Sequence, residues 1–105
     1  MSAAVSSDVL HAIDSVLDVI WGTVKPNPQV TLRQFAMVLY AIKTGGATQT
    51  ELAELTGCSK SAISKSYAGL GPDGSGCLQT DSRGKVVADQ HVLDAFEAIF
   101  ASKQT

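Results

Sequence analysis

Between Ser7 and Gly22, large apolar residues recur at steps of three and four along the chain: Val9, Leu10, Ile13, Val16, Leu17, Ile20 and Trp21. This spacing places them on one face of an amphipathic helix. The sequence therefore predicts a helix over residues 7–22. The segment KPNP, residues 25–28, cannot continue it, because proline lacks an amide proton and disfavours helical backbone before it.

Two further helices are marked by capping boxes. Thr31-Leu-Arg-Gln opens a segment that ends at Gly45, and its predicted inward residues are Leu32, Phe35, Ala36, Val38, Leu39 and Ile42. Thr48-Gln-Thr-Glu opens a shorter helix that ends at Gly57, with Leu52, Ala53 and Leu55 predicted to point inward. In each box the Thr hydroxyl and the Gln or Glu side chain exchange hydrogen bonds with the opposite backbone amide.

The next segment has the spacing of a helix-turn-helix. Counting from Gln49, a small residue follows at Ala53, a glycine at Gly57 and a β-branched apolar residue at Ile63. Ala53 allows a close helix crossing, Gly57 turns the chain, and Ile63 fills the space between the helices. Ser59 is predicted to cap the second helix of the pair.

A β-hairpin is predicted over residues 77–88, because two short β-prone runs flank the turn Asp-Ser-Arg-Gly. Asp89 then caps a last helix that carries Val92, Leu93, Phe96, Ile99 and Phe100. The predicted fold class is mainly α, with about five helices and a small two-stranded hairpin.

At 105 residues and 45% hydrophobic composition, the chain is long enough for one core, which predicts a single domain over residues 1–105. It contains no apolar run of the roughly 20 residues needed to cross a bilayer, and no membrane association is expected. The spacing of Cys58, Cys77, His11 and His91 matches no zinc site, so no metal or cofactor is expected. These features favour a cytoplasmic protein.

The net charge of −2 is unevenly distributed. Residues 1–24 contain three aspartates and no Lys or Arg, and residues 86–105 carry a net charge of −2. Residues 58–85 carry a net charge of +2, from Lys60, Lys65, Arg83 and Lys85 against two aspartates. The basic segment coincides with the predicted second helix and hairpin, which favours a polyanion as the ligand of that surface.

The segment TLRQFAMVLYAIKTGGATQTELAELTGCSKSAISKSYAGL, with the hairpin after it, resembles the core of the winged helix-turn-helix regulators of the MarR family. The resemblance covers residue 31 to about residue 87 and rests on the TQTELA and SKSAIS motifs. It implies a DNA-binding core over 31–88 with a wing over 77–88, and dimerisation through helices 7–22 and 89–101. Family members are longer and frame a small-ligand pocket with their terminal helices. The shorter helices here leave a small-molecule effector as an open alternative.

The candidate DNA contacts are Gln49, Thr50, Ser59, Lys60, Ser61, Ser64, Lys65, Arg83 and Lys85. Lysines and short hydroxyls suit phosphates and base edges, and the resemblance assigns Arg83 to the minor groove. Each residue also has a simpler interpretation. The lysines could be solvated helix charges, Ser59, Gln49 and Thr50 could serve only as capping residues, and Arg83 could be an exposed turn residue.

The candidate dimer contacts are Leu10, Ile13, Leu17, Trp21, Phe96 and Phe100. With few cations per chain, two subunits on an inverted repeat would bind DNA more tightly than one. The sequence therefore predicts a homodimer that binds double-stranded DNA, with transcriptional repression as the leading hypothesis. Two alternatives remain: a winged helix used for protein contacts, and a phage or plasmid replication or partition protein. We expect no enzyme, because no set of nucleophile, base and orienting group is present.

Overall fold

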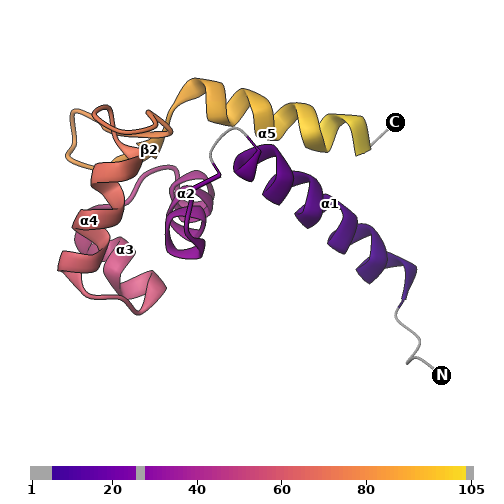
Figure 1. Cartoon of the computed structure of the whole chain (residues 1–105), viewed down its shortest axis with the longest axis horizontal. Helices are drawn as coiled ribbons and strands as arrows, with labels where there is room; N and C mark the ends of the chain where they lie inside the picture. The colour runs from indigo at the N-terminus through magenta and orange to yellow at the C-terminus, as the bar shows by residue number, and fades with distance from the viewer. Residues whose placement is uncertain (1–5, 26–27, 104–105) are drawn as a thin grey trace.

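The computed structural model describes residues 6–25 and 28–103, with the side chains of the last helix described as far as Ile99. The described residues form a mainly helical α+β fold with one two-stranded antiparallel sheet (Figure 1). In chain order the elements are α1 (Ser7–Val24), α2 (Leu32–Thr44), α3 (Gln49–Thr56), α4 (Lys60–Leu70), β1 (Leu78–Thr80), β2 (Val86–Ala88) and α5 (Gln90–Lys103).

Both predicted capping boxes are confirmed. At the start of α2, the Gln34 amide donates to Thr31 Oγ1 at 3.1 Å and the Thr31 amide donates to Gln34 Oε1 at 3.0 Å. At the start of α3, Thr48 and Glu51 make the same exchange at 3.1 and 2.9 Å. These bonds satisfy amides that the first helical turn leaves without partners, which fixes where both helices begin.

The hairpin is also confirmed, and it is attached to the loop between α2 and α3. β1 pairs with β2 in the register Leu78 to Ala88. Ala47 extends the ladder by one bridge, because its amide donates to the Val86 carbonyl at 3.1 Å and its carbonyl accepts the Val86 amide at 2.7 Å. The turn end of the hairpin is therefore held against the start of α3.

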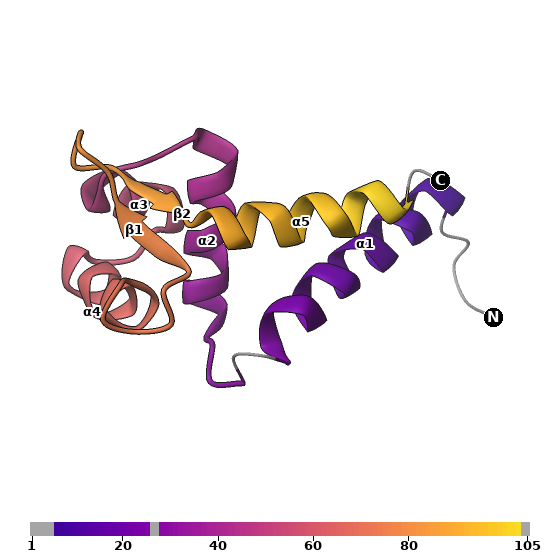
Figure 2. The same ribbon diagram turned by 90° about the horizontal axis from the view of Figure 1, so that it is seen from above.

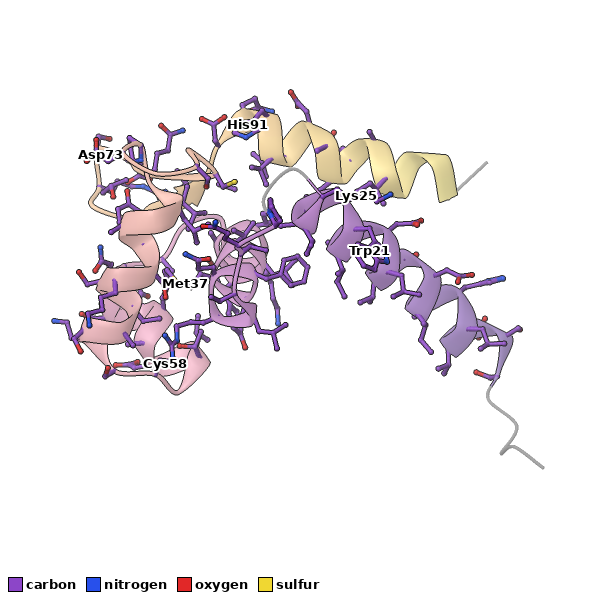
Figure 3. The ribbon with its side chains drawn as sticks, viewed as in Figure 1. Trp21, Lys25, Met37, Cys58, Asp73 and His91 are labelled. Carbon is purple, nitrogen blue, oxygen red and sulfur yellow. The ribbon has the colours of Figure 1, made fainter. Side chains whose placement is uncertain are left out.

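The core lies where α2, α3, α4 and the hairpin meet. Its largest fully buried side chains are Met37, Leu52, Ile63, Leu78 and Val86, which come from α2, α3, α4, β1 and β2 in that order. Figure 3 shows Met37 on the side of α2 that faces α3 and α4. In the described part of the chain, every buried side-chain nitrogen or oxygen has a hydrogen-bond partner.

Three residues predicted to point inward do not. Leu32 is 84% exposed, and Leu39 and Leu55 are 39% and 45% exposed. The face of α2 that reaches the core is instead formed by Met37, Val38 and Ala41. The sequence allowed this error because α2 has apolar residues around most of its circumference, and only packing decides which side is covered.

α1 and α5 project away from this core. Figures 1 and 2 show the two helices together at one end of the molecule, with α3, α4 and the hairpin at the other. The radius of gyration is 15.0 Å, above the roughly 13 Å of a compact chain of this length. None of the helices in residues 6–25 and 28–103 is both long and apolar enough to cross a membrane.

The apolar stripe of α1 is exposed, whereas the side of the helix that carries Gly22 faces α5. Val19 is buried, and a Cβ added to Gly22 would lie 3.3 Å from Ile99 Cδ1 of α5. With 100° of rotation per residue, the stripe lies roughly opposite this contact. The exposed large residues are Val9, Leu10, Ile13, Val16, Leu17 and Trp21, all 44–53% exposed.

Gly46 provides a test of the attachment between the hairpin and the α2–α3 loop. Its φ is +132°, and an added Cβ would lie 3.1 Å from both Arg83 Nη2 and Val87 Cγ1. We expect Gly46→Ala to lower the free energy of unfolding by about 2–4 kcal/mol, because it adds backbone strain and a clash with the hairpin. Urea unfolding measures the loss.

The matched control is Gly57→Ala. Gly57 has a φ of +72°, but an added Cβ would meet nothing within 4 Å. The loss there should be limited to about 1–2 kcal/mol of left-handed backbone strain. Equal losses for the two variants would contradict a tight hairpin attachment at Gly46.

Candidate nucleic-acid interface

α4 has a buried side and an exposed side. Ser59 caps the helix as predicted, since its Oγ accepts the Ala62 amide at 3.1 Å. Ile63, Ser66 and Leu70 are buried. The opposite side, which we call the α4 outer face, consists of Ser59, Lys60, Ser61, Ser64 and Lys65, all of them exposed.

The charge of the α4 outer face is uncompensated. The helix contains no Asp or Glu. Among the described residues, neither Lys60 nor Lys65 has a carboxylate within ion-pair distance. Both ammonium groups are therefore available to an external anion, flanked by hydroxyl groups that can donate or accept hydrogen bonds.

Ser66 has an unusual environment for a buried position of such a helix, where a bulky apolar residue is the common choice. Gln34 Nε2 of α2 donates to the Ser66 carbonyl at 3.3 Å. Gly69 leaves room for this amide, because a Cβ there would lie 2.8 Å from Gln34 Nε2. The small residues Ser66 and Gly69 thus let α2 approach α4 closely, and Gln34 serves both the capping box and this contact.

Arg83 lies in the hairpin turn and is held by Asp81. The guanidinium Nη2 and Nε donate to Asp81 Oδ2 at 2.7 and 3.0 Å. Asp81 Oδ1 accepts the backbone amides of Arg83 and Lys85 at 2.8 and 3.0 Å. One carboxylate thus organises the turn and orients the arginine, whose side chain remains 60% exposed.

The first turn of α3 lies beside the turn end of the hairpin. Lys85 Nζ is 4.0 Å from Glu51 Oε1, and the Lys85 side chain is 35% exposed. Thr50 is exposed and Gln49 is half-buried. Lys85 is therefore partly neutralised and partly covered, in contrast to the two lysines of α4.

The hairpin and α4 are joined by a hydrogen bond that the sequence analysis did not identify. The Tyr67 and Thr80 hydroxyls are 2.8 Å apart, linking α4 to β1. Both elements lie at the end of the molecule away from α1 and α5 (Figure 2). The structure therefore brings the α4 outer face and the Arg83 turn to the same end of the molecule.

The candidate dimer residues fall into three groups. Leu10, Ile13, Leu17 and Trp21 lie on the exposed stripe of α1. Phe96 is half-buried and packs against the core, and its place in a dimer contact stays a prediction. The side chain of Phe100 lies outside the described residues.

A cleft of about 580 Å³ lies where the end of α1, α2, the end of α4 and the start of α5 meet. Its apolar lining includes Val38, Leu70 and Phe96, and Gln34 and His91 add polar groups. The volume is within the range of small-ligand sites. The cleft is separate from the α4 outer face, because none of the residues of that face lines it.

The cysteines and histidines form no metal site in the described residues. Cys58 and Cys77 are both free. Cys58 lies at the turn between α3 and α4, marked in Figure 3, where hydrogen bonds from Thr56 and Arg33 lower the pKa of its thiol. His91 at the start of α5 is exposed and contacts the Asp89 carboxylate, which also caps the helix by accepting the His91 amide at 3.1 Å.

No protein-family model, curated protein or solved structure matches this chain.

The role of Asp81 predicts a pH dependence. Hydrogen bonds from the Arg83 side chain and from the Lys85 amide hold the pKa of the Asp81 carboxyl below its usual value of 3.8. The carboxylate therefore stabilises the fold fully above the usual pKa, and this contribution is lost as the pH falls toward the lower, folded pKa. Asp81→Asn should lower the thermal midpoint at pH 7, and the difference from the wild type should shrink as the pH falls below about 4.

Thermal melts monitored by circular dichroism across this pH range measure the effect. Asp73→Asn, in the exposed loop before β1 (Figure 3), is the control for removing a surface carboxylate. A difference between wild type and Asp81→Asn that stays constant down to pH 2 would contradict the role of the charged form.

Proposed function

We propose that this protein binds double-stranded DNA in a sequence-specific manner through a winged helix-turn-helix, with α3 and α4 as the helix pair and the hairpin as the wing. The observation that carries the proposal is the α4 outer face, where two lysines stand among three exposed serines and have no carboxylate of the described residues within ion-pair distance. An 11-residue helix is about 16 Å long, which suits the roughly 12 Å wide major groove.

The individual side chains have complementary roles in this proposal. Lys60 and Lys65 bind phosphates or the acceptor edge of guanine, and the exposed serines approach bases or phosphates. The wing lies over the adjacent minor groove, where Arg83 is directed by Asp81 toward the duplex. The acidic ends of the chain lie on α1 and α5, away from this surface, which orients the molecule on the polyanion.

The proposal includes a homodimer. A single copy offers few cations, and phosphate neutralisation by so few groups gives a weak and salt-sensitive complex. The exposed stripe of α1 supports association, because six large apolar side chains on one helix are a strong docking surface. A two-fold dimer requires an inverted repeat, with half-site centres about 10–10.5 base pairs apart or a multiple of this. Occlusion of a promoter by such a dimer would make the protein a transcriptional repressor.

Selection of bound sequences from a random DNA pool at moderate salt tests the proposal. We expect an enriched inverted repeat, bound by two chains. Lys60→Ala and Lys65→Ala should each weaken binding to the selected sequence by about 1–3 kcal/mol per contact, which is roughly 5- to 150-fold. Fluorescence anisotropy with a labelled duplex measures the affinity.

Lys25→Ala is the matched control, since it removes one exposed lysine beyond the end of α1, far from α4 (Figure 3). Its affinity should stay within about twofold of the wild type. The absence of any enriched sequence, or equal effects of Lys25→Ala and Lys60→Ala, would overturn the proposal.

The dimer has its own test. Leu17→Asp places a charge in the middle of the exposed α1 stripe, where the helix contributes little to the core. We expect it to shift the protein from dimer to monomer in analytical ultracentrifugation, while the variant still unfolds in one cooperative thermal transition. A wild-type protein that stays monomeric at the highest soluble concentration would contradict the dimer while leaving DNA binding open.

A further inference from the structure

The exposed stripe of α1 is not the only apolar surface in its neighbourhood. On α2, Leu32 and Leu39 are exposed and lie seven residues apart, so that they share one side of the helix. Lys43 continues the same side one turn further on. We call these three residues the α2 outer side.

α1 and the α2 outer side border one open angle. α1 packs against α5 rather than against α2, and Figure 1 shows α1 running away from α2 beneath α5. The vertex of this angle is the 580 Å³ cleft, where Gly22 and Thr23 of α1 and Val38 of α2 line the same hollow. Met37 faces α3 and α4, and Leu39 follows two residues later, 200° around the helix, on the side of α2 turned away from them. Figure 1 shows α1 on that side of α2.

The area of the α1 stripe is too small for a stable dimer by itself. Six large side chains, each about half exposed, offer roughly 500 Å², against about 800 Å² per partner in a standard interface. Leu32, at 84% exposed, and Leu39 supply much of the missing apolar area. An occupant of the angle between the two helices would cover both surfaces together.

Charge identifies the occupant. α1 contains three aspartates and no Lys or Arg, so that two α1 helices packed only on each other would gather six carboxylates. α2 contains no Asp or Glu, and its outer side carries the cation Lys43. A second copy's α1 laid against this side brings an acidic helix to Lys43 and the apolar stripe onto Leu39.

We propose that α1 of a second copy occupies the angle between α1 and α2, and that the α2 outer side is part of the dimer interface. This inference rests on the homodimer of the proposed function and adds the surface of the DNA-binding core that receives the partner. Because the contact is reciprocal under two-fold symmetry, each copy inserts its α1 and receives one. α2 thereby connects the interface to α4, which it holds through Gln34.

A pair of matched variants tests the inference. Leu39→Asp should raise the dimer dissociation constant by about a hundredfold or more, because it buries a charge in the interface. Leu55→Asp, on α3 at a similar exposure of 45%, should leave the constant within about twofold. Sedimentation equilibrium measures both constants, and thermal melts verify that both variants fold. A dimer as tight with Leu39→Asp as with the wild type would overturn the inference.

A crosslink identifies the occupant directly. With the photoreactive amino acid p-benzoylphenylalanine at position 39, irradiation should produce a covalent dimer. Because trypsin does not cut before proline, α1 remains in a single peptide of residues 1–33, and position 39 lies in residues 34–43. We expect these two peptides to be joined in the dimer band, at a position within residues 7–24. The same crosslink in a monomer band, or attachment to a peptide without α1, would overturn the inference.

Failure of this interface can be distinguished from failure of the proposed DNA binding. DNA selection and anisotropy report on the α4 outer face, and the crosslink and sedimentation report only on association. A protein that selects an inverted repeat but tolerates Leu39→Asp retains its proposed function and loses this interface. A protein with the predicted crosslink and no selected sequence retains the interface and loses the function.

Discussion

The burial of Ile63 between α3, α4 and α2 is the contact on which the rest of this structure depends. Ile63 has no exposed surface, and neither do Leu52 of α3 and Met37 of α2. Once this side chain is fixed inside, the 3.6-residue repeat of the helix determines which residues of α4 can face outward. Lys60, Ser64 and Lys65 are exposed for this reason, so that the basic face is a geometric consequence of the hydrophobic core.

A second set of contacts sets the position of the hairpin relative to α4. The Ala47–Val86 bridge attaches it to the start of α3, and the Tyr67–Thr80 hydrogen bond attaches it to α4. α3 is therefore connected to two elements: to α4 through the hydrophobic core, and to the hairpin through the Ala47–Val86 bridge. On the proposed function, the basic surface consists of two separate elements, α4 and the hairpin. If the hairpin were loosely attached, ordering it would cost conformational entropy in every binding event.

Local features of the sequence predicted much of this fold. The two capping boxes, the glycine at the α3–α4 turn and the Ser59 cap depend on residues within four positions of each other, and all are confirmed. The prediction of which side of α2 faces the core was wrong at Leu32 and Leu39. When a helix has apolar residues on most sides, its sequence does not indicate which side packs against the other elements. The same limit applies to the site. The lysines and serines of α4 followed from the motif, whereas the control of Arg83 by Asp81 depends on the geometry of the turn and was missed.

The Asp81–Arg83 pair changes how the basic surface responds to ions. An arginine that keeps a carboxylate beside it carries little net charge, so it neutralises little of the phosphate charge that holds counterions on a duplex. On the proposed function, Arg83 and, to a lesser degree, Lys85 would contribute contacts and orientation without adding to the release of ions from the duplex. Lys60 and Lys65 alone would then carry the salt sensitivity of each subunit. The ionic strength of the solution would control how long α4 stays in the groove, while the hairpin would keep its shape whether or not DNA is present.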